Sequence, residues 1–412
     1  MSSFGILFLA ALALATATRL WLGLRHIGFV RNHRSQVPDE FSSEISLAAH
    51  QKAADYTVAK TRLALIGVMI EAFVALAFTF GGGLRLVDHL ARAWAVGSIT
   101  HGLLLIALVV VVTSAIELPF SLYRVFVIEE RFGFNKMTLK LFFIDMFKAA
   151  AVAGILGLPL VAAVLWLMER MGEYWWIYAW VLWVIFNLFM LAVYPTWIAP
   201  LFNKFSPMEN PELRERVERL LARCGFKVKG LMVMDGSTRS THGNAYFTGF
   251  GKAKRIVFFD TLLERLNPAE VEAVLAHELG HFRLHHVMKR MAWVFLASLA
   301  FLWLLGFLMQ QQWFYTGLNV AEPSTGMALV VFSIVVPQFT FLLQPFGAMY
   351  SRKHEFEADQ YAVHNASASD LVSALVKLYK DNASTLTPDP LHSAFYDSHP
   401  PATVRIARLE KA

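Results

Sequence analysis

The sequence predicts a mainly α-helical, polytopic membrane protein that also carries a small α+β domain. Hydrophobic residues make up 56% of its 412 residues and charged residues only 17%, well below the about 25% of an ordinary soluble domain. The apolar residues gather into seven runs close to the about 20 residues that a membrane-spanning helix needs. Two long stretches outside these runs carry helix and strand patterns instead, which predicts a folded domain outside the bilayer.

The first apolar run is expected to be a retained span rather than a cleaved signal peptide. No basic residue precedes it, and it continues through Arg19 to Leu22. Pro159, Pro337 and Pro345 lie inside later spans, where neighbouring helices can satisfy the freed carbonyl groups. The predicted spans are 4–22, 63–82, 103–123, 149–167, 174–194, 290–309 and 327–349.

The loops between the predicted spans alternate in basic charge. Residues 23–62 contain six Lys or Arg and residues 124–148 contain five, whereas residues 83–102 contain two and residues 310–326 none. Because basic loops stay on the cytoplasmic side, we expect the N-terminus outside and the C-terminus inside. The expected location is a bacterial inner membrane, with no nucleic-acid partner.

The stretches that follow the fifth and seventh spans are expected to form one cytoplasmic domain in two pieces. The predicted organisation is membrane helices 1 to 5 in 1–194, the first part of the domain in 195–289, membrane helices 6 and 7 in 290–349, and the second part of the domain in 350–412.

The first piece of this domain has recognisable helix boundaries. Asn210 and Pro211 mark the start of a helix that is expected to end at Gly225. Three strand-type runs follow, with the sequences KGLMVMD, NAYFTGF and RIVFF. A second helix is expected to begin after Asn267, with Glu270 placed for a capping box.

This second helix contains the sequence His-Glu-Leu-Gly-His at residues 277–281. Residues four apart lie on one face of a helix, so His277 and His281 could bind one metal ion together. Glu278 would then act as a general base rather than as a ligand. The alternative interpretation is two surface histidines on a charged helix, which a third ligand would argue against.

A third ligand is expected in the charged stretch that follows the seventh span. Glu355 and Asp359 are four residues apart and share one helical face. Glu355 could supply a carboxylate oxygen to zinc, and Asp359 could accept a hydrogen bond from the far nitrogen of His277. Glu357 is interpreted as a solvated charge.

Other candidate ligands are set aside. Cys224 is the one cysteine of the chain, so a cysteine pair cannot form a metal site. A third histidine ten residues after His277 is absent, because Val287 stands there. His285 and His286 are interpreted as ordinary residues near the membrane surface or as contacts to substrate, and His354 has no assigned role.

Several motifs together resemble the type I CAAX prenyl proteases, a family of integral-membrane zinc enzymes. HELGH, EFEAD after a membrane span and SHPPATVR near the end carry the resemblance. RFGFNKMT at 131–138, PLFNKFSP at 200–207 and NAYFTGF at 244–250 extend it over nearly the whole chain. It implies seven helices around a hydrated chamber, capped on the cytoplasmic side by a zincin-like metalloprotease domain.

The resemblance also implies roles for particular residues. His277, His281 and Glu355 match the ligands of one zinc ion per chain, with Glu278 as the base. Asn244 matches an edge-strand position beside the active site, where a peptide would add as a further strand. His399 and Arg405 match residues that face the substrate, where they would stabilise an oxyanion or hold the peptide backbone.

The substrate and two acidic residues remain open at this point. A peptide or protein with a prenylated CAAX end is one alternative, and a quality-control protease without a prenyl substrate is another. A transporter with a structural zinc ion is the third alternative. Glu71 and Glu117 lie inside predicted spans, where they could face a water-filled cavity or form a hydrogen bond between helices.

Overall fold

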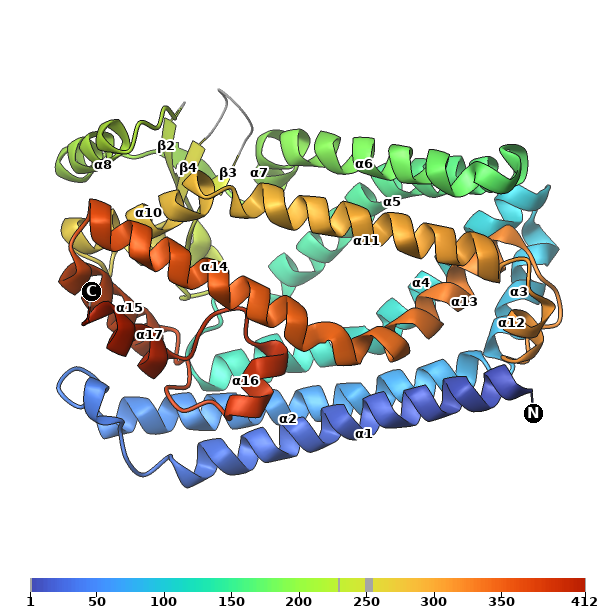
Figure 1. Cartoon of the computed structure of the whole chain (residues 1–412), viewed down its shortest axis with the longest axis horizontal. Coiled ribbons are helices and arrows are strands. Elements are labelled where there is room, and N and C mark those ends of the chain that lie inside the picture. Colours follow the sequence, from blue (N-terminus) through green and yellow to red (C-terminus); the bar gives the residue numbers. More distant parts are fainter. Residues whose placement is uncertain (1, 229, 249–254, 412) are drawn as a thin grey trace.

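The computed structural model describes residues 2–228, 230–248 and 255–411, and it has two parts (Figure 1). A bundle of long helices forms one part, and a smaller α+β cap forms the other. Within the described residues, seven helical segments are long and apolar enough to span a membrane, as the sequence predicts. Their main helices are α1 (Ser3–Asn32), α2 (Leu47–Phe78), α4 (Ser98–Tyr123), α5 (Leu139–Arg170), α6 (Trp175–Val193), α11 (His286–Leu308) and α13 (Thr325–Thr340), which leads into α14 (Gln344–Asn365).

Most of these helices extend beyond the apolar runs that identify them. α2 begins at Leu47, 16 residues before the predicted span at 63–82, and its N-terminus is capped by the Ser46 side chain. Its first half is rich in alanine and lysine, which are strong helix formers. At about 1.5 Å per residue, a helix of 32 residues is longer than the hydrocarbon core, so α2 reaches the cap, where Tyr56 packs in one cluster with Ala383.

The end of the bundle away from the cap is closed by two short helices, α3 (Gly83–Trp94) and α12 (Gln312–Thr316) (Figure 1). The sequence predicts only a loop after the second span, because α3 is too short to cross a bilayer. α3 is amphipathic instead, and Leu84, Val87 and Ala91 on its apolar side belong to the core of the bundle. The N-terminus lies near this end, and the C-terminus lies in the cap (Figure 1).

A cavity of about 610 Å³ lies among α2, α4 and α5 in the bundle. Glu71 and Glu117 both line it, and their side chains are 63% and 61% exposed. Glu71 also pairs with Arg19 of α1 at 2.6 Å. The structure therefore favours the interpretation in which both acidic residues face a cavity, and it adds an ion pair between helices for one of them.

The cap contains a mixed four-stranded sheet in the order β1-β2-β4-β3. β2 and β4 are parallel, and the two outer strands are antiparallel to their neighbours. The last two residues of the predicted run NAYFTGF lie outside the described residues. The strands are β1 (Phe205–Pro207), β2 (Gly230–Met234), β3 (Ala245–Thr248) and β4 (Arg255–Phe259).

The sequence predicts three strand-type runs in this domain, and β1 is a further strand that it does not predict. Pro207 ends this strand, and proline is tolerated on an edge strand, which does not need every N–H group. Around the sheet, Phe258, Leu220 and Leu275 belong to a separate hydrophobic core. The cap helices are α8 (Pro211–Arg223), α10 (Pro268–Arg283), α15 (Ala368–Asp381), α16 (Pro390–Tyr396) and α17 (Ala402–Leu409).

Candidate metal centre and active site

Helices α10 and α14 approach each other closely at the centre of the candidate site. A Cβ atom on Gly280 of α10 would lie only 2.9 Å from the Cα atom of Ala358 of α14, so a larger residue would push the helices apart. Gly280 is the fourth residue of His-Glu-Leu-Gly-His. Its missing side chain therefore brings the histidine face of α10 within reach of the carboxylates of α14. The start of α10 is fixed by the expected capping box of Asn267 and Glu270.

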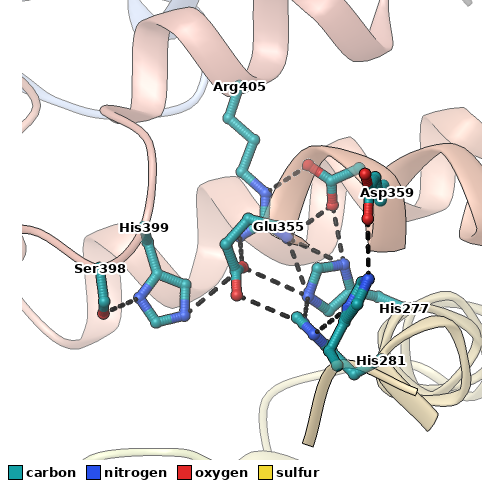
Figure 2. A network of polar contacts seen from close by, with 9 residues as sticks. His277, His281, Glu355, Asp359, Ser398, His399 and Arg405 are labelled. Atoms are coloured by element: carbon teal, nitrogen blue, oxygen red, sulfur yellow. Dashed lines mark hydrogen bonds and ion pairs between the residues drawn. The ribbon is translucent and has the colours of Figure 1, made fainter. Parts of the chain in front are cut away.

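The three predicted ligands converge on one point (Figure 2). His277 Nε2 lies 3.2 Å from His281 Nε2, which lies 3.3 Å from Glu355 Oε1. His277 Nε2 lies 3.5 Å from Glu355 Oε2. Two atoms that each bind a tetrahedral zinc ion at about 2.0–2.1 Å are about 3.3–3.4 Å apart. Glu355 Oε2 is also buried without a hydrogen-bond partner, so this donor set fits a metal ion.

Asp359 holds the far side of the His277 ring, as the spacing on α14 predicts. Its Oδ1 atom lies 2.8 Å from His277 Nδ1. A carboxylate can only accept a hydrogen bond, so His277 carries its proton on Nδ1. The lone pair of Nε2 then faces His281 and Glu355, which is the tautomer that a metal ligand requires.

Arg405 of α17 lies against Asp359 and the His277 ring. Its side chain is buried, and it donates two hydrogen bonds to Asp359, from Nε to Oδ2 at 2.7 Å and from Nη2 to Oδ1 at 2.6 Å. A guanidinium with two bonds to a buried carboxylate is fixed in orientation. The Arg405 Nη2 atom also lies 3.3 Å from His277 Nε2, and its Nη1 atom lies 3.9 Å from Glu355 Oε2. Arg405 is therefore part of the ligand cluster, and its expected contact with a substrate stays a prediction.

The charges around His277 act on its protonation in opposite directions. Burial and the Arg405 cation lower the pKa of His277, but the carboxylates of Asp359 and Glu355 beside it raise it, and the rise prevails. Burial also acts to lower the pKa of Arg405, and its hydrogen bonds to Asp359 overcome this and raise it above its usual value. Arg405 therefore remains a cation in the closed interior and holds Asp359 in its ionised form.

His399 lies at the open side of the ligand cluster, on the segment between α16 and α17. Its Nε2 atom lies 3.5 Å from Glu355 Oε2, and its side chain is 63% exposed. The Ser398 hydroxyl contacts its Nδ1 atom at 3.0 Å. His399 thus borders the candidate metal site and is accessible from outside, as expected for a group that contacts a substrate (Figure 2).

Glu278 and Asn244 are the two remaining predicted residues. Glu278 follows His277 on α10 and is half-buried. Asn244 directly precedes β3, and its carbonyl oxygen accepts a hydrogen bond from the Phe259 amide of β4 at 3.0 Å. β3 is an outer strand of the sheet, so the edge strand implied by the resemblance is present among the described residues.

Three residues that the sequence reasoning set aside contact the site. His286 Nδ1 lies 3.1 Å from His281 Nδ1, and His286 Nε2 lies 2.9 Å from Glu357 Oε2. The His286 ring also stacks on the His354 ring, with centroids 4.0 Å apart. Spacing gives no signal for these contacts, because a residue five positions after His281 would lie on another face of a straight helix.

The two halves of the chain match two family models that belong together. Residues 26–204 match a model described as CAAX prenyl protease N-terminal, five membrane helices. Residues 207–412 match the model of peptidase family M48. The boundary between the two matches falls where the fifth span ends and the cap begins.

Relatives from several organisms agree over most of the chain. A CAAX prenyl protease 1 homolog of Arabidopsis thaliana is 42% identical over 76% of this chain and 74% of its own length. CAAX prenyl protease 1 of Saccharomyces cerevisiae is 30% identical over 91% of this chain and 89% of its own length. The crystal structure of S. mikatae Ste24p superposes with a TM-score of 0.93 at 29% identity, and covers 99% of both chains. The chain therefore belongs to peptidase family M48, as a membrane metalloprotease of the CAAX prenyl protease 1 family.

Proposed function

We propose that this metalloprotease is a zinc endopeptidase that holds one zinc ion per chain between His277, His281 and Glu355. The observation that carries the proposal is the convergence of the three side chains. The two histidine Nε2 atoms lie 3.2 Å apart, and the two Glu355 oxygens lie 3.3 Å from His281 Nε2 and 3.5 Å from His277 Nε2. A catalytic zinc ion has three protein ligands and a free fourth position, whereas a structural zinc ion has four protein ligands. The donor set therefore argues against a transporter with a structural zinc ion.

The residues around this ion have separate roles in hydrolysis. A zinc ion bound here would polarise the scissile carbonyl and lower the pKa of a water molecule to about 7. Glu278 takes the proton from that water and passes it to the nitrogen of the leaving amine. Asp359 accepts a hydrogen bond from His277 Nδ1 and keeps that ring in the orientation of a ligand.

His399 and Arg405 take different roles in this proposal. His399 is exposed beside Glu355, so its Nε2 can donate a hydrogen bond to the oxygen that becomes negative in the transition state. Arg405 is buried against Asp359 and acts as a positioning residue for Asp359 and His277. The peptide adds as a further strand beside β3, near Asn244, through main-chain hydrogen bonds that tolerate many side chains.

The substrate that we propose is a lipid-modified protein ending in a CAAX sequence. The names of the Arabidopsis and yeast relatives support this choice. The site residues themselves recognise a peptide backbone and contain no element specific for a prenyl group. The competing proposal is therefore a quality-control protease that cuts membrane proteins without a prenyl group.

A pair of matched peptides tests both parts of this proposal. Prenylated and unprenylated forms of one CAAX peptide are offered to the wild-type protein and to Glu278→Gln. We expect cleavage by the wild type alone, and faster cleavage of the prenylated form. Equal rates for both forms would favour the quality-control protease, and no cleavage of either would argue against the endopeptidase.

We also propose that the cap faces the cytoplasm of a bacterial cell, with the N-terminus outside. The basic loops 23–62 and 124–148 support this orientation. An impermeant thiol reagent should label a cysteine placed at Ser324 in intact cells, but not one placed at Ser369, which is exposed on the cap. The native Cys224 is buried in the cap, so the wild type serves as the unlabelled control. Labelling at Ser369 alone would reverse the orientation.

A further inference from the structure

The second histidine of the candidate metal site has a nitrogen whose partner the proposed mechanism does not use. His281 Nε2 faces the other ligands, and His281 Nδ1 faces His286 Nδ1 at 3.1 Å. His286 Nε2 in turn faces Glu357 Oε2 at 2.9 Å. We infer that His286 and Glu357 are a positioning pair that fixes the ring of His281 as a metal ligand, an inference that rests on the proposed zinc site.

The protons in this series of hydrogen bonds, from His281 through His286 to Glu357, can be assigned without conflict. An imidazole that binds a metal through Nε2 carries its proton on Nδ1, so His281 donates from Nδ1. His286 Nδ1 must then accept, which leaves the proton of His286 on Nε2. That proton points to the carboxylate of Glu357, which can only accept. Each of the two hydrogen bonds therefore has one donor and one acceptor.

The ring of the other histidine ligand, His277, is fixed by a different arrangement. His277 donates directly to Asp359, whereas His281 reaches a carboxylate only through a second imidazole. The carboxylate at the end of each arrangement comes from α14, two residues after Glu355 in one case and four residues after it in the other. One helix therefore supplies a ligand and also the anchors for both histidine ligands.

The backbone explains why His286 can turn back toward His281. His285, at the junction of α10 and α11, has a left-handed backbone conformation with φ of 58°, which ends one helix and starts the next. His286 is buried as a result, while His285 is exposed. The two adjacent histidines, which sequence reasoning treated alike, thus have different environments.

The geometry favours a positioning pair over a second metal site. His286, His354 and Glu357 are close enough to hold an ion by distance. The rings of His286 and His354, however, stack with an angle of 6° between their planes. The lone pairs of an imidazole lie in its ring plane, so parallel stacked rings do not aim them at one ion. Stacking on His354 instead fixes the plane of the His286 ring.

The test compares metal binding in variants that differ at these positions. His286→Leu removes the acceptor, and the loss of such an outer partner typically weakens metal binding about 10–100-fold. His286→Asn restores an acceptor near the place of Nδ1 and should recover most of the affinity. His285→Asn is the matched control, because asparagine tolerates the left-handed conformation and His285 makes no contact with His281 that the proposal uses.

The measurements separate the positioning role from a loss of folding. Zinc affinity is measured by competition with a chelator, and the visible spectrum of the Co²⁺-loaded protein reports the ligand geometry. We expect both to change in His286→Leu and less in Glu357→Ala, which is half-exposed and carries little risk for folding. The double variant should lose no more affinity than His286→Leu, because Glu357 acts through His286.

The possible outcomes distinguish the positioning pair from the proposed function. A zinc-binding wild type with unchanged affinity and Co²⁺ spectrum in both His286→Leu and Glu357→Ala would overturn the positioning pair and leave the proposed function intact. A wild type that binds no zinc would overturn the proposed function and the positioning pair with it. Two zinc ions per chain, falling to one in His354→Ala, would replace the positioning pair by a second metal site.

Discussion

Acidic side chains are buried in the cap but exposed in the membrane cavity. In the cap, the side chains of Glu355 and Asp359 are only 7% and 5% exposed, and Asp359 accepts hydrogen bonds from two Arg405 nitrogens. In the bundle, Glu71 and Glu117 are more than half exposed. Glu117 has one arginine near it, Arg124, at 3.8 Å.

This difference predicts where the molecule tolerates a change of charge. A buried ionised group needs a partner, and removing one member of a buried pair leaves an uncompensated charge. An exposed ion pair contributes about 0–1 kcal/mol, because water replaces the lost partner. Substitutions of these buried groups in the cap should therefore weaken or abolish metal binding or activity, whereas isosteric changes on the cavity wall should have small effects.

The largest effect is expected from Glu355→Ala. This substitution removes one of three proposed ligands and exposes the site to water, so most of the zinc and all measurable activity should be lost. Metal analysis of purified protein, together with a peptide cleavage assay, measures both. Equal zinc content in the wild type and Glu355→Ala would contradict the third ligand and weaken the contrast between cap and cavity.

Glu278→Gln should lose activity without losing metal. A general base typically contributes about 10²–10⁴-fold to the rate, and Glu278 is not one of the converging ligand atoms. Zinc content should therefore match the wild type while cleavage falls on that scale. A protein that lost its zinc on this change would require Glu278 to be reassigned as a ligand.

His399→Ala should reduce kcat by about 10²–10³-fold, the usual cost of removing an oxyanion donor. Its side chain is exposed, so folding and zinc content should not change. A change confined to KM would instead assign His399 to binding the peptide. Arg405→Lys is the comparison variant, because lysine cannot reproduce the two hydrogen bonds to Asp359, and it should weaken zinc binding as well.

Asp359→Asn should weaken zinc binding by about 10–100-fold while some activity remains at high zinc concentration. The amide cannot accept from His277 Nδ1–H as strongly as a carboxylate, and Arg405 would lose its charged partner. A titration with zinc under chelator competition measures the effect. An unchanged affinity would show that the buried pair of Asp359 and Arg405 stabilises the cap and not the metal site.

The sequence is informative about the site where spacing on a helix decides the contacts. Residues four apart placed His277 near His281 and Glu355 near Asp359, and the structure brings these pairs together. Periodicity could not predict that α10 and α14 cross at Gly280, because that contact depends on the packing of distant segments. The search for a third metal ligand paired the two helices, and the resemblance supported that pairing.

Sequence reasoning failed where a backbone break or burial redirects a side chain. The left-handed conformation of His285 separates α10 from α11 and turns His286 toward His281. The residue pattern does not predict this break between the helices. Arg405 lies at the site as the resemblance implies, but the residue pattern does not predict its burial or its two hydrogen bonds to Asp359. In the bundle, apolar runs identified the spans, and the helices continue beyond them because polar helix formers follow without a stop signal.

The smallest effect is expected on the cavity wall, from Glu117→Gln. This change removes a charge without changing shape, as Asp359→Asn does in the cap, so the two variants isolate the effect of environment. Glu117 is 61% exposed and its arginine neighbour is 3.8 Å away, which places the pair among those worth at most about 1 kcal/mol. Zinc content should be unchanged, and the cleavage rate should stay within about twofold of the wild type. Charges at bilayer depth often mark functional positions, so this variant also tests whether Glu117 has a function in cleavage. A tenfold loss of cleavage with zinc intact would show that the cavity wall takes part in holding the substrate, and the contrast between the two regions would then be one of role and not of tolerance.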